Sequence, residues 1–510
     1  MIFLLIIASF MISGTLIAQH NGDPLLFQGL TERNQVGVKG SAYGNAFTSR
    51  SNDLNALFSN AAGLADLQSI QISVSTHYRD FLTRDNQNFY PGSGYVGTSL
   101  YLEHLLIPDP AWNNIWDDSL RTIVYDSLGT PIGTNWWNAD KLQWPVQGVD
   151  DYSKEATDHE QTFNRVAFDH IAIAVPFKFE GKHFVVAASY NRQYDVYDYD
   201  WNGSYLDPHW GSSDIIQAAP GSIVRSNWSV FSRRRTGGLY AFTGALAFQY
   251  DDHLLLGTKL NWVSGKSTDE QTLDRIGYFR FKHGENQSRW SFSYETNGQQ
   301  INGTSEYRTS ELSLGALYTS STLNLGLNIQ LLSTITRTWS YSTQLIDSSN
   351  VTTSIISGID KVHMPAIYTA GITIKPNQGL IVSFAYEYNA LSTAKYELSR
   401  GTPDSLPYYA RWVDQISLRA GIEYSISSTV TILGGYQTRG APFIGYGVAI
   451  RDAGAPMESY SCGISLSIVY GRFDVAYIVN RLKYYDVYMT NRNFTLEQSQ
   501  RLSLGYTMSL

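Results

Sequence analysis

The segment 322–331 reads TLNLGLNIQL and decides the fold class of this chain. Its odd-numbered positions are all aliphatic: Leu323, Leu325, Leu327, Ile329 and Leu331. The positions between them are polar or small. Successive side chains of a β-strand point to opposite faces, so this period of two gives one aliphatic face and one face rich in amides.

The same alternation recurs along the chain after about residue 68 and predicts many more strands. By this pattern strands lie at about 69–79, 165–179, 183–195, 237–250, 253–265, 304–319, 322–340, 363–375, 379–390, 412–426, 429–438, 458–470, 473–484 and 499–510. The last of them alternates up to the final residue, Leu510, which suits a sheet that closes by pairing its last strand with its first.

Short and long connections alternate between these strands. The short polar turns are expected at Glu180–Lys182, Asp251–Asp252, Ser320–Ser321, Pro376–Gln378, Ser427–Ser428 and Gly471–Arg472, and the longest connectors at 80–164, 196–236 and 266–303. In outer-membrane barrels short turns face the periplasm and long loops face outside. We therefore predict an all-β fold, a transmembrane antiparallel β-barrel of about fourteen strands in the bacterial outer membrane.

Composition agrees with a barrel and excludes several other classes. The 510 residues include 42 Gly, 35 Tyr and 12 Trp, while only 16% are charged. The net charge of −8 argues against a nucleic-acid partner. The single cysteine, Cys462, excludes an internal disulfide and a thiolate metal cluster. No enzyme motif is present, so we expect no catalytic residue, cofactor or metal.

Residues 1–18, MIFLLIIASFMISGTLIA, resemble a signal peptide cleaved after Ala18, and the alternative is a retained helical anchor. The barrel is then expected to occupy 69–510, preceded by a segment at 19–68. Within that segment an i, i+3, i+4, i+7 apolar pattern predicts a short helix around 53–60: Leu54, Leu57, Phe58 and Ala61. Asn52 or Asp53 is a suitable N-cap, and Gly63 suits a left-handed exit. The apolar stripe needs cover, which the barrel interior supplies, so 19–68 is predicted to be a plug.

The stretch from Gly40 to Leu67 resembles the N-terminal signature of the FadL/TodX family of outer-membrane transporters for hydrophobic compounds. The matching residues are Gly40, Ala42, Gly44, Ala46, Phe47, Thr48, Asn52, Asp53, Ala56, Leu57, Phe58, Asn60, Ala62, Gly63, Leu64 and Ala65. The chain departs from the family at Ala61, where proline is usual, which puts a rigid turn there in doubt. The resemblance implies that this segment is a helical hatch, positioned by Gly40, Gly44, Asn52, Asp53, Phe58, Asn60, Ala62 and Gly63.

The resemblance also implies a mechanism. Extracellular loops capture a hydrophobic ligand, such as a long-chain fatty acid or an aromatic hydrocarbon. The ligand enters a pocket in the lumen and leaves through a lateral gap beside a distorted strand, with no energy source coupled. Pro176 could mark such a distortion, although strand termination beside a turn is the favoured interpretation. We expect a monomer in contact with outer-membrane lipid and lipopolysaccharide.

Charged residues within the strands are expected to line the lumen, because a basic residue facing lipid at mid-membrane depth costs about 2–4 kcal/mol. They are Lys178, Lys259, Glu387, Arg419, Glu423 and Asp474. Lys259, Arg419 and Glu423 are candidate ligand-binding residues, with Arg419 or Lys259 for a carboxylate head group. The alternative is that these charges pair with one another and only fill the barrel.

The first two long connectors hold eight of the 12 tryptophans: Trp112, Trp116, Trp136, Trp137, Trp144, Trp201, Trp210 and Trp228. Exposed aromatic surface marks binding sites, so Trp112, Trp116, Trp201 and Trp210 are candidates for ligand capture. The alternative is a rigid aromatic cap with no ligand. The acidic run Asp195, Asp198 and Asp200 could hold a cation, but a solvated surface loop is favoured.

Three functions remain open. The first is passive import of hydrophobic compounds. The second is a PorV-like accessory role in protein secretion, and the third is a general diffusion porin. A plug in the lumen weighs against an open porin, whereas protruding loops suit either of the other two.

Overall fold

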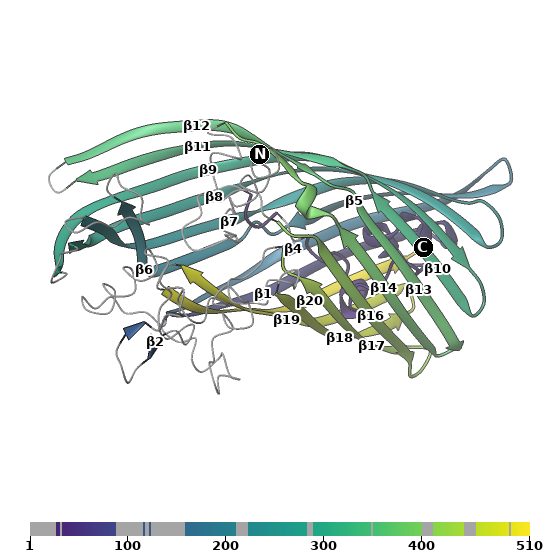
Figure 1. Ribbon diagram of the computed structural model, residues 1–510. Coiled ribbons are helices and arrows are strands. Elements are labelled where there is room, and N and C mark those ends of the chain that lie inside the picture. Colours follow the sequence, from purple (N-terminus) through teal and green to yellow (C-terminus); the bar gives the residue numbers. More distant parts are fainter. Residues whose placement is uncertain are drawn as a thin grey trace, which may run out of the picture.

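The computed structural model describes residues 27–30, 33–87, 116–117, 122–123, 159–210, 223–282, 289–347, 350–399, 412–442, 455–488 and 491–510 (Figure 1). One antiparallel sheet contains 18 strand segments. They are β1 (Gln71–Gln87), β4 (His159–Phe179), β5 (Lys182–Tyr194), β6 (Asp198–Trp210), β7 (Ile223–Gln249), β8 (Leu254–Lys282), β9 (Arg289–Thr319), β10 (Leu323–Gln330), β11 (Ser333–Asp347), β12 (Asn350–Met364), β13 (Ile367–Asn377), β14 (Leu380–Asn389), β15 (Lys395–Glu397), β16 (Gln415–Ser425), β17 (Val430–Gly440), β18 (Pro456–Ile468), β19 (Gly471–Tyr488) and β20 (Asn491–Ser509). A separate two-stranded sheet joins β2 (Trp116–Asp117) to β3 (Thr122–Ile123).

The large sheet closes into a barrel. β1 pairs with β20 from Gln71 opposite Ser509 to Gln87 opposite Asn493, which leaves neither strand with an open edge. In four places two segments run in line and act as one wall strand: β5 with β6, β10 with β11, β12 with β13, and β14 with β15. The wall therefore has 14 strands, and the predicted fold class is confirmed.

The two faces of the wall differ in polarity. In the stretch TLNLGLNIQL, Leu325 and Leu327 are 46% and 59% exposed on the outer surface, while Asn324 is buried inside. In β20, Leu502 and Leu504 point outward, whereas Arg501, Ser503 and Thr507 are buried. The aliphatic face thus lies outside, where a bilayer covers it, and the amide face lines the lumen.

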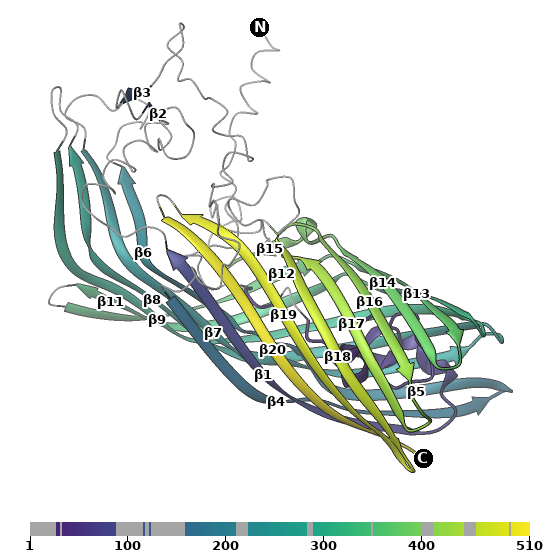
Figure 2. The same ribbon diagram turned by 90° about the horizontal axis from the view of Figure 1, so that it is seen from below.

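Several strands run farther than the sequence pattern predicts. β6, β7, β8 and β9 extend into the expected connectors 196–236 and 266–303, and β11 and β12 extend into the interval 341–362 between the predicted strands 322–340 and 363–375. They continue as a sheet beyond the ends of β16–β18 (Figure 2). On β8 the outward residues of this extension are polar or charged, as Lys266, Thr268 and Glu270 show, whereas β12 still exposes Val351, Ile355 and Ile359. Where the regular apolar alternation ends, as on β8, the sequence pattern no longer reveals a strand although backbone pairing continues.

The regular ladder is interrupted at a few places. The predicted strand 322–340 is divided at Leu331–Leu332, and the inward face changes from even-numbered to odd-numbered residues across this break. In β4 a bulge at Asp169 turns two consecutive residues, Asp169 and His170, into the lumen. Pro176 pairs with Val185 without a register shift, so it does not mark a distortion. The predicted turn at Gly471–Arg472 lies two residues earlier, between β18 and β19.

The segment before β1 lies inside the barrel. It contains α2 (Val38–Ala42), α3 (Ala56–Ser59) and the 3-10 helix η1 (Ala61–Asp66). Figures 1 and 2 both show these helices enclosed by strands near the end of the barrel that carries the C-terminus. We call residues 33–66 the hatch.

No helix in the described ranges combines the length and the apolar character needed to cross a membrane.

Inward-facing glycines let the hatch approach the wall closely. A Cβ added to Gly257 of β8 would lie 2.6 Å from the carbonyl carbon of Ala61, and one added to Gly326 of β10 would lie 2.8 Å from the Cα of Ser49. Glycines on other strands also face the hatch: Gly315, Gly371, Gly421, Gly435, Gly463 and Gly505. Because these positions carry no side chain, the hatch backbone packs directly on the backbone of the wall.

We expect Gly257→Val to prevent the hatch from seating against β8. An extra side chain in a well-packed site costs about 1–3 kcal/mol, and here the hatch backbone must yield because the wall is fixed by its ladder. In planar bilayers the wild type is expected to stay closed and the variant to conduct.

Gly244→Val is the matched control, because this glycine faces outward on β7 and an added Cβ meets only the ring of Trp262 at 3.7 Å. If Gly257→Val folds and stays as closed as the control, close packing at Gly257 does not seat the hatch.

Candidate functional site

Asn60 joins the two helical parts of the hatch to the wall. Its side-chain oxygen accepts from the N–H of Ala62 and caps the start of η1. Its amide nitrogen donates to three carbonyl oxygens, those of Thr48 at 2.9 Å, Ala316 at 3.1 Å and Leu327 at 3.2 Å. Ala316 lies on β9 and Leu327 on β10. The buried Asn60 side chain therefore bonds both to the hatch segment around Thr48 and to two strands of the wall.

Ion pairs attach the hatch to other strands of the wall, β16 and β19. Glu423 of β16 receives Lys39 Nζ at 3.1 Å and Arg50 Nη2 at 2.6 Å, and both donors belong to the hatch. Arg472 of β19 reaches Asp53 of the hatch at 2.8 Å and Asp474 of its own strand at 2.9 Å. The buried carboxylates therefore each have cationic partners, as burial of a charge requires.

Asp53 has a different local role from the predicted one. The helix begins later than expected, at Ala56, and Asn55 is its N-cap residue with no side-chain capping bond. Asp53 instead accepts from the backbone N–H and the side chain of Asn55 and pairs with Arg472. Burial opposes ionisation of Asp53, but Arg472 and Lys39 outweigh it and hold the pKa of this carboxyl well below its usual range.

The other predicted hatch residues all lie in or beside the hatch helices. Gly63 is inside η1 and not at a left-handed exit; a Cβ there would lie 2.9 Å from the Cβ of Ala56. Gly44 has a φ of +62°, and Asn52 has one of 58°. The remaining three are Gly40 and Ala62, which are buried, and Phe58, whose ring centroid lies 4.8 Å from that of His170. Their roles in positioning the hatch remain predictions.

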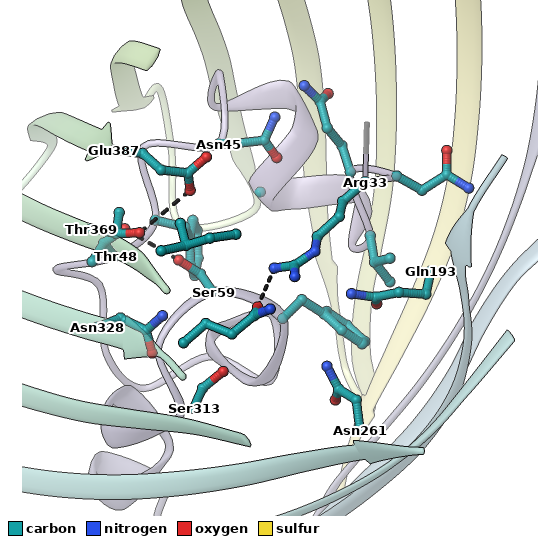
Figure 3. A pocket seen from close by; sticks show the side chains of 18 of the residues that line it. Arg33, Asn45, Thr48, Ser59, Gln193, Asn261, Ser313, Asn328, Thr369 and Glu387 are labelled. Atoms are coloured by element: carbon teal, nitrogen blue, oxygen red, sulfur yellow. Dashed lines mark hydrogen bonds between the residues drawn. The ribbon is translucent and has the colours of Figure 1, made fainter. Parts of the chain in front are cut away.

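A cavity of about 180 Å³ lies between the hatch and the wall. Hatch residues Arg33, Asn45, Thr48 and Ser59 surround it together with wall residues of several strands (Figure 3). Its lining is mainly polar, with asparagine and glutamine the most frequent types, and Phe58, Met364 and Ile367 contribute apolar surface. We take this cavity as the candidate ligand site.

Two of the three predicted lumen charges line the cavity, and the third does not. Arg419 pairs with Glu387 at 2.8 Å. Lys259 donates to the carbonyl oxygens of Leu57 and Phe58 at the end of α3, at 3.1 and 3.2 Å. Glu423 lies among the hatch ion pairs and is absent from the cavity lining. Lys259 is thus occupied by the hatch, which disfavours it as a binder of a carboxylate head group.

Sequence reasoning did not identify a polar cluster beside the cavity, in which Arg33 and Tyr194 line the cavity and Glu311 bonds to both. Glu311 of β9 accepts from Tyr194 at 2.8 Å and from Arg33 at 3.1 Å, and Arg33 also contacts Gln330. Alternation could have placed Glu311 and Tyr194 on inward faces, but Arg33 precedes any recognisable element.

The acidic run is neither solvated nor a cation site. Asp195 pairs with Arg79, Arg165 and Arg192, and both Asp198 and Asp200 pair with Arg233. Among the residues that the structure describes, no group of three His, Cys, Asp or Glu side chains is arranged to hold a metal ion.

The candidate capture residues fall largely outside the described part. Trp112 lies outside the described residues, and so do the side chains of Trp116 and Trp210, although their backbones belong to β2 and β6. Trp201 is half-buried on β6. Loop capture therefore stays a prediction.

No protein-family model matches the chain, and no curated protein matches it in sequence. Solved structures do match. A FadL homologue of Pseudomonas aeruginosa is 13% identical, with a TM-score of 0.57 over 93% of this chain and 98% of that one. The toluene transporter TodX of P. putida is 11% identical, with a TM-score of 0.52 over 93% and 98%. A TodX deltaS2S3 mutant, described as a monoaromatic hydrocarbon channel, is 12% identical, with a TM-score of 0.54 over 94% of this chain and 99% of that one. The predicted likeness to FadL and TodX is confirmed at the level of the fold.

We expect Asp53→Asn to loosen the hatch, because it removes the carboxylate that ties Arg472 of β19 to the hatch and leaves Arg472 with Asp474 of its own strand. Breaking a fully buried pair costs about 3–5 kcal/mol, and this one costs less because the Arg472 side chain is 21% exposed and keeps Asp474. In the wild type the depressed pKa of Asp53 means that its stabilisation is complete above about pH 4 and is lost as the pH falls further. Limited proteolysis from the open end of the barrel, at pH 7 and at pH 5, should cleave the hatch in the variant only.

Glu397→Gln is the control, since Glu397 pairs with Lys361 on the exposed outer surface and such pairs contribute about 0–1 kcal/mol. Equal protection of the hatch in Asp53→Asn and in this control would mean that the Asp53–Arg472 pair does not hold the hatch.

Proposed function

We propose that this protein is a passive outer-membrane channel for small hydrophobic molecules, closed at rest by its hatch. The observation that carries the proposal is the combination of a closed wall with a hatch seated backbone to backbone inside it. A cavity lies directly against that hatch. Molecules collected at the outer surface reach this cavity, and a rearrangement of the hatch or wall lets them leave.

The size of the cavity favours a compact cargo. Its volume of about 180 Å³ is close to the roughly 150 Å³ of an engineered protein cavity that binds benzene. Pockets for drug-sized ligands span about 300–1,000 Å³. Among the cargoes considered, a single aromatic ring therefore fits better than a whole long-chain fatty acid. The likeness of fold to TodX supports the same class.

The seated hatch disfavours a general diffusion porin. Asn60, Glu423 and Arg472 fix the hatch at separate points of the wall. A porin needs a continuous aqueous passage, which such a plug obstructs. A secretion-accessory role also fits a plugged barrel, and the experiment below separates it from transport.

Uptake of labelled toluene and of labelled oleate should be measured in cells that lack their own importer of this class. Expression of the wild-type chain is expected to raise toluene uptake several-fold over an empty vector, with a smaller effect on oleate. Uptake equal to the vector, together with recovery of a protein partner from native membranes, would contradict the proposal and favour the secretion-accessory role.

A disulfide that locks the hatch tests whether the hatch is the gate. Ser49 Oγ of the hatch lies 2.7 Å from Thr373 Oγ of β13. In a Cys462→Ser background, Ser49→Cys with Thr373→Cys is expected to abolish uptake when oxidised and to restore it on reduction. The control joins two wall strands at Ser425 and Thr431, whose hydroxyl oxygens lie 3.3 Å apart. Full uptake through the oxidised hatch lock would show that passage does not need hatch movement.

A further inference from the structure

We propose that the lumen cavity selects neutral aromatic compounds that carry two or more hydroxyl groups, in preference to plain hydrocarbons. This inference rests on the proposed function and names the class of compound that the cavity binds best. It follows from four buried polar atoms, belonging to residues that line the cavity, that the described hatch and wall residues do not satisfy.

These four atoms come from two pairs of adjacent wall strands. They are Ser313 Oγ on β9, Asn328 Oδ1 on β10, Asn389 Oδ1 on β14 and Arg419 Nε on β16, and all four residues line the cavity. None of the four has a hydrogen-bond partner among the described residues. Ser313 is only 2% exposed and Asn389 only 6%. Figure 3 shows Ser313 and Asn328 on adjacent strands around the same space.

A hydrocarbon in this cavity would leave these atoms without partners, and a buried polar group without a partner is unfavourable. The amide oxygens need donors, Arg419 Nε needs an acceptor, and Ser313 Oγ takes either role. A hydroxyl group both donates and accepts, so it matches this mixed set. If an amide is turned over, its nitrogen faces the cavity in place of its oxygen, and a hydroxyl still satisfies it.

Four cationic side chains line the cavity, Arg33, Lys259, Arg419 and Arg439, and the first three are engaged by protein groups that an anion would have to displace. Arg33 is paired with Glu311 and Arg419 with Glu387. The ammonium of Lys259 donates to two backbone carbonyl oxygens. An incoming carboxylate would therefore have to compete with Glu311 for Arg33, or with Glu387 for Arg419.

Apolar surface in the cavity accounts for the aromatic part. Phe58, Met364 and Ile367 line it together with the polar groups, and the volume of about 180 Å³ suits one ring. Sites for small molecules commonly combine apolar walls with a few placed polar groups that set orientation and specificity.

The test is calorimetric titration of the full chain in lipid nanodiscs with resorcinol, which has two hydroxyls, with toluene, which has none, and with benzoate, which is anionic. We expect resorcinol to bind at least tenfold more tightly than toluene or benzoate. Asn389→Leu and Ser313→Ala should each weaken resorcinol at least fivefold, without weakening toluene. Ser310→Ala is the matched control, because Ser310 lies on the same strand and faces outward.

The outcomes separate this inference from the proposed function. Toluene bound as tightly as resorcinol, or unchanged resorcinol affinity in both Asn389→Leu and Ser313→Ala, would overturn the hydroxyl preference and leave transport of hydrophobic molecules standing. Benzoate bound most tightly would overturn the preference for a neutral compound. Binding of none of the three, by a protein whose heat-modifiable barrel is intact, would overturn both the inference and the proposed cavity site.

Discussion

The close approach of the hatch backbone to the barrel wall is the constraint on which the rest of the structure depends. A barrel of 14 strands encloses more space than its own side chains fill, so the lumen must hold either water or another part of the chain. Glycines such as Gly257 and Gly326 remove side chains where the hatch passes, which lets carbonyl and amide groups of the two layers meet. Asn60 uses this proximity, because its side chain reaches carbonyls of two wall strands at once.

Electrostatics then determine which parts of the lumen are fixed and which are open to a ligand. Charges at the hatch, such as Glu423 and Asp53, are saturated by two cations each. Removing one partner would leave a charge in a site that water reaches poorly, so these networks resist rearrangement. In the cavity, by contrast, Asn389 and Ser313 keep unpartnered polar atoms. The ion pairs therefore hold the hatch in place, whereas the residues that line the cavity include polar groups without a protein partner.

The sequence predicted the architecture well because lipid imposes a simple rule on a barrel wall. Alternation in a stretch such as 322–331 reveals the strand, its two faces and, repeated along the chain, the number of strands. The rule fails where lipid ends. Above the apolar belt the outward residues of β8 become polar, as Lys266, Thr268 and Glu270 show, so this part of the strand looks like a loop. The break at Leu331–Leu332 was also missed, because the alternation runs up to it and only the two adjacent exposed leucines indicate it.

The site was less predictable than the fold, for a physical reason that Lys259 illustrates. Alternation correctly placed Lys259 on the inner face, but its partners are carbonyls of a hatch helix some two hundred positions earlier in the chain. The position of the hatch determines which charged side chains of the lumen have partners. That position depends on inward-facing glycines such as Gly257, and a glycine in the sequence does not reveal that another segment packs against it. The unpartnered atoms of the cavity are therefore a property of the assembled layers. If the lumen charges are held by one another or by the hatch while neutral polar groups keep no partner, a cargo is selected by hydrogen bonding and shape more than by charge attraction.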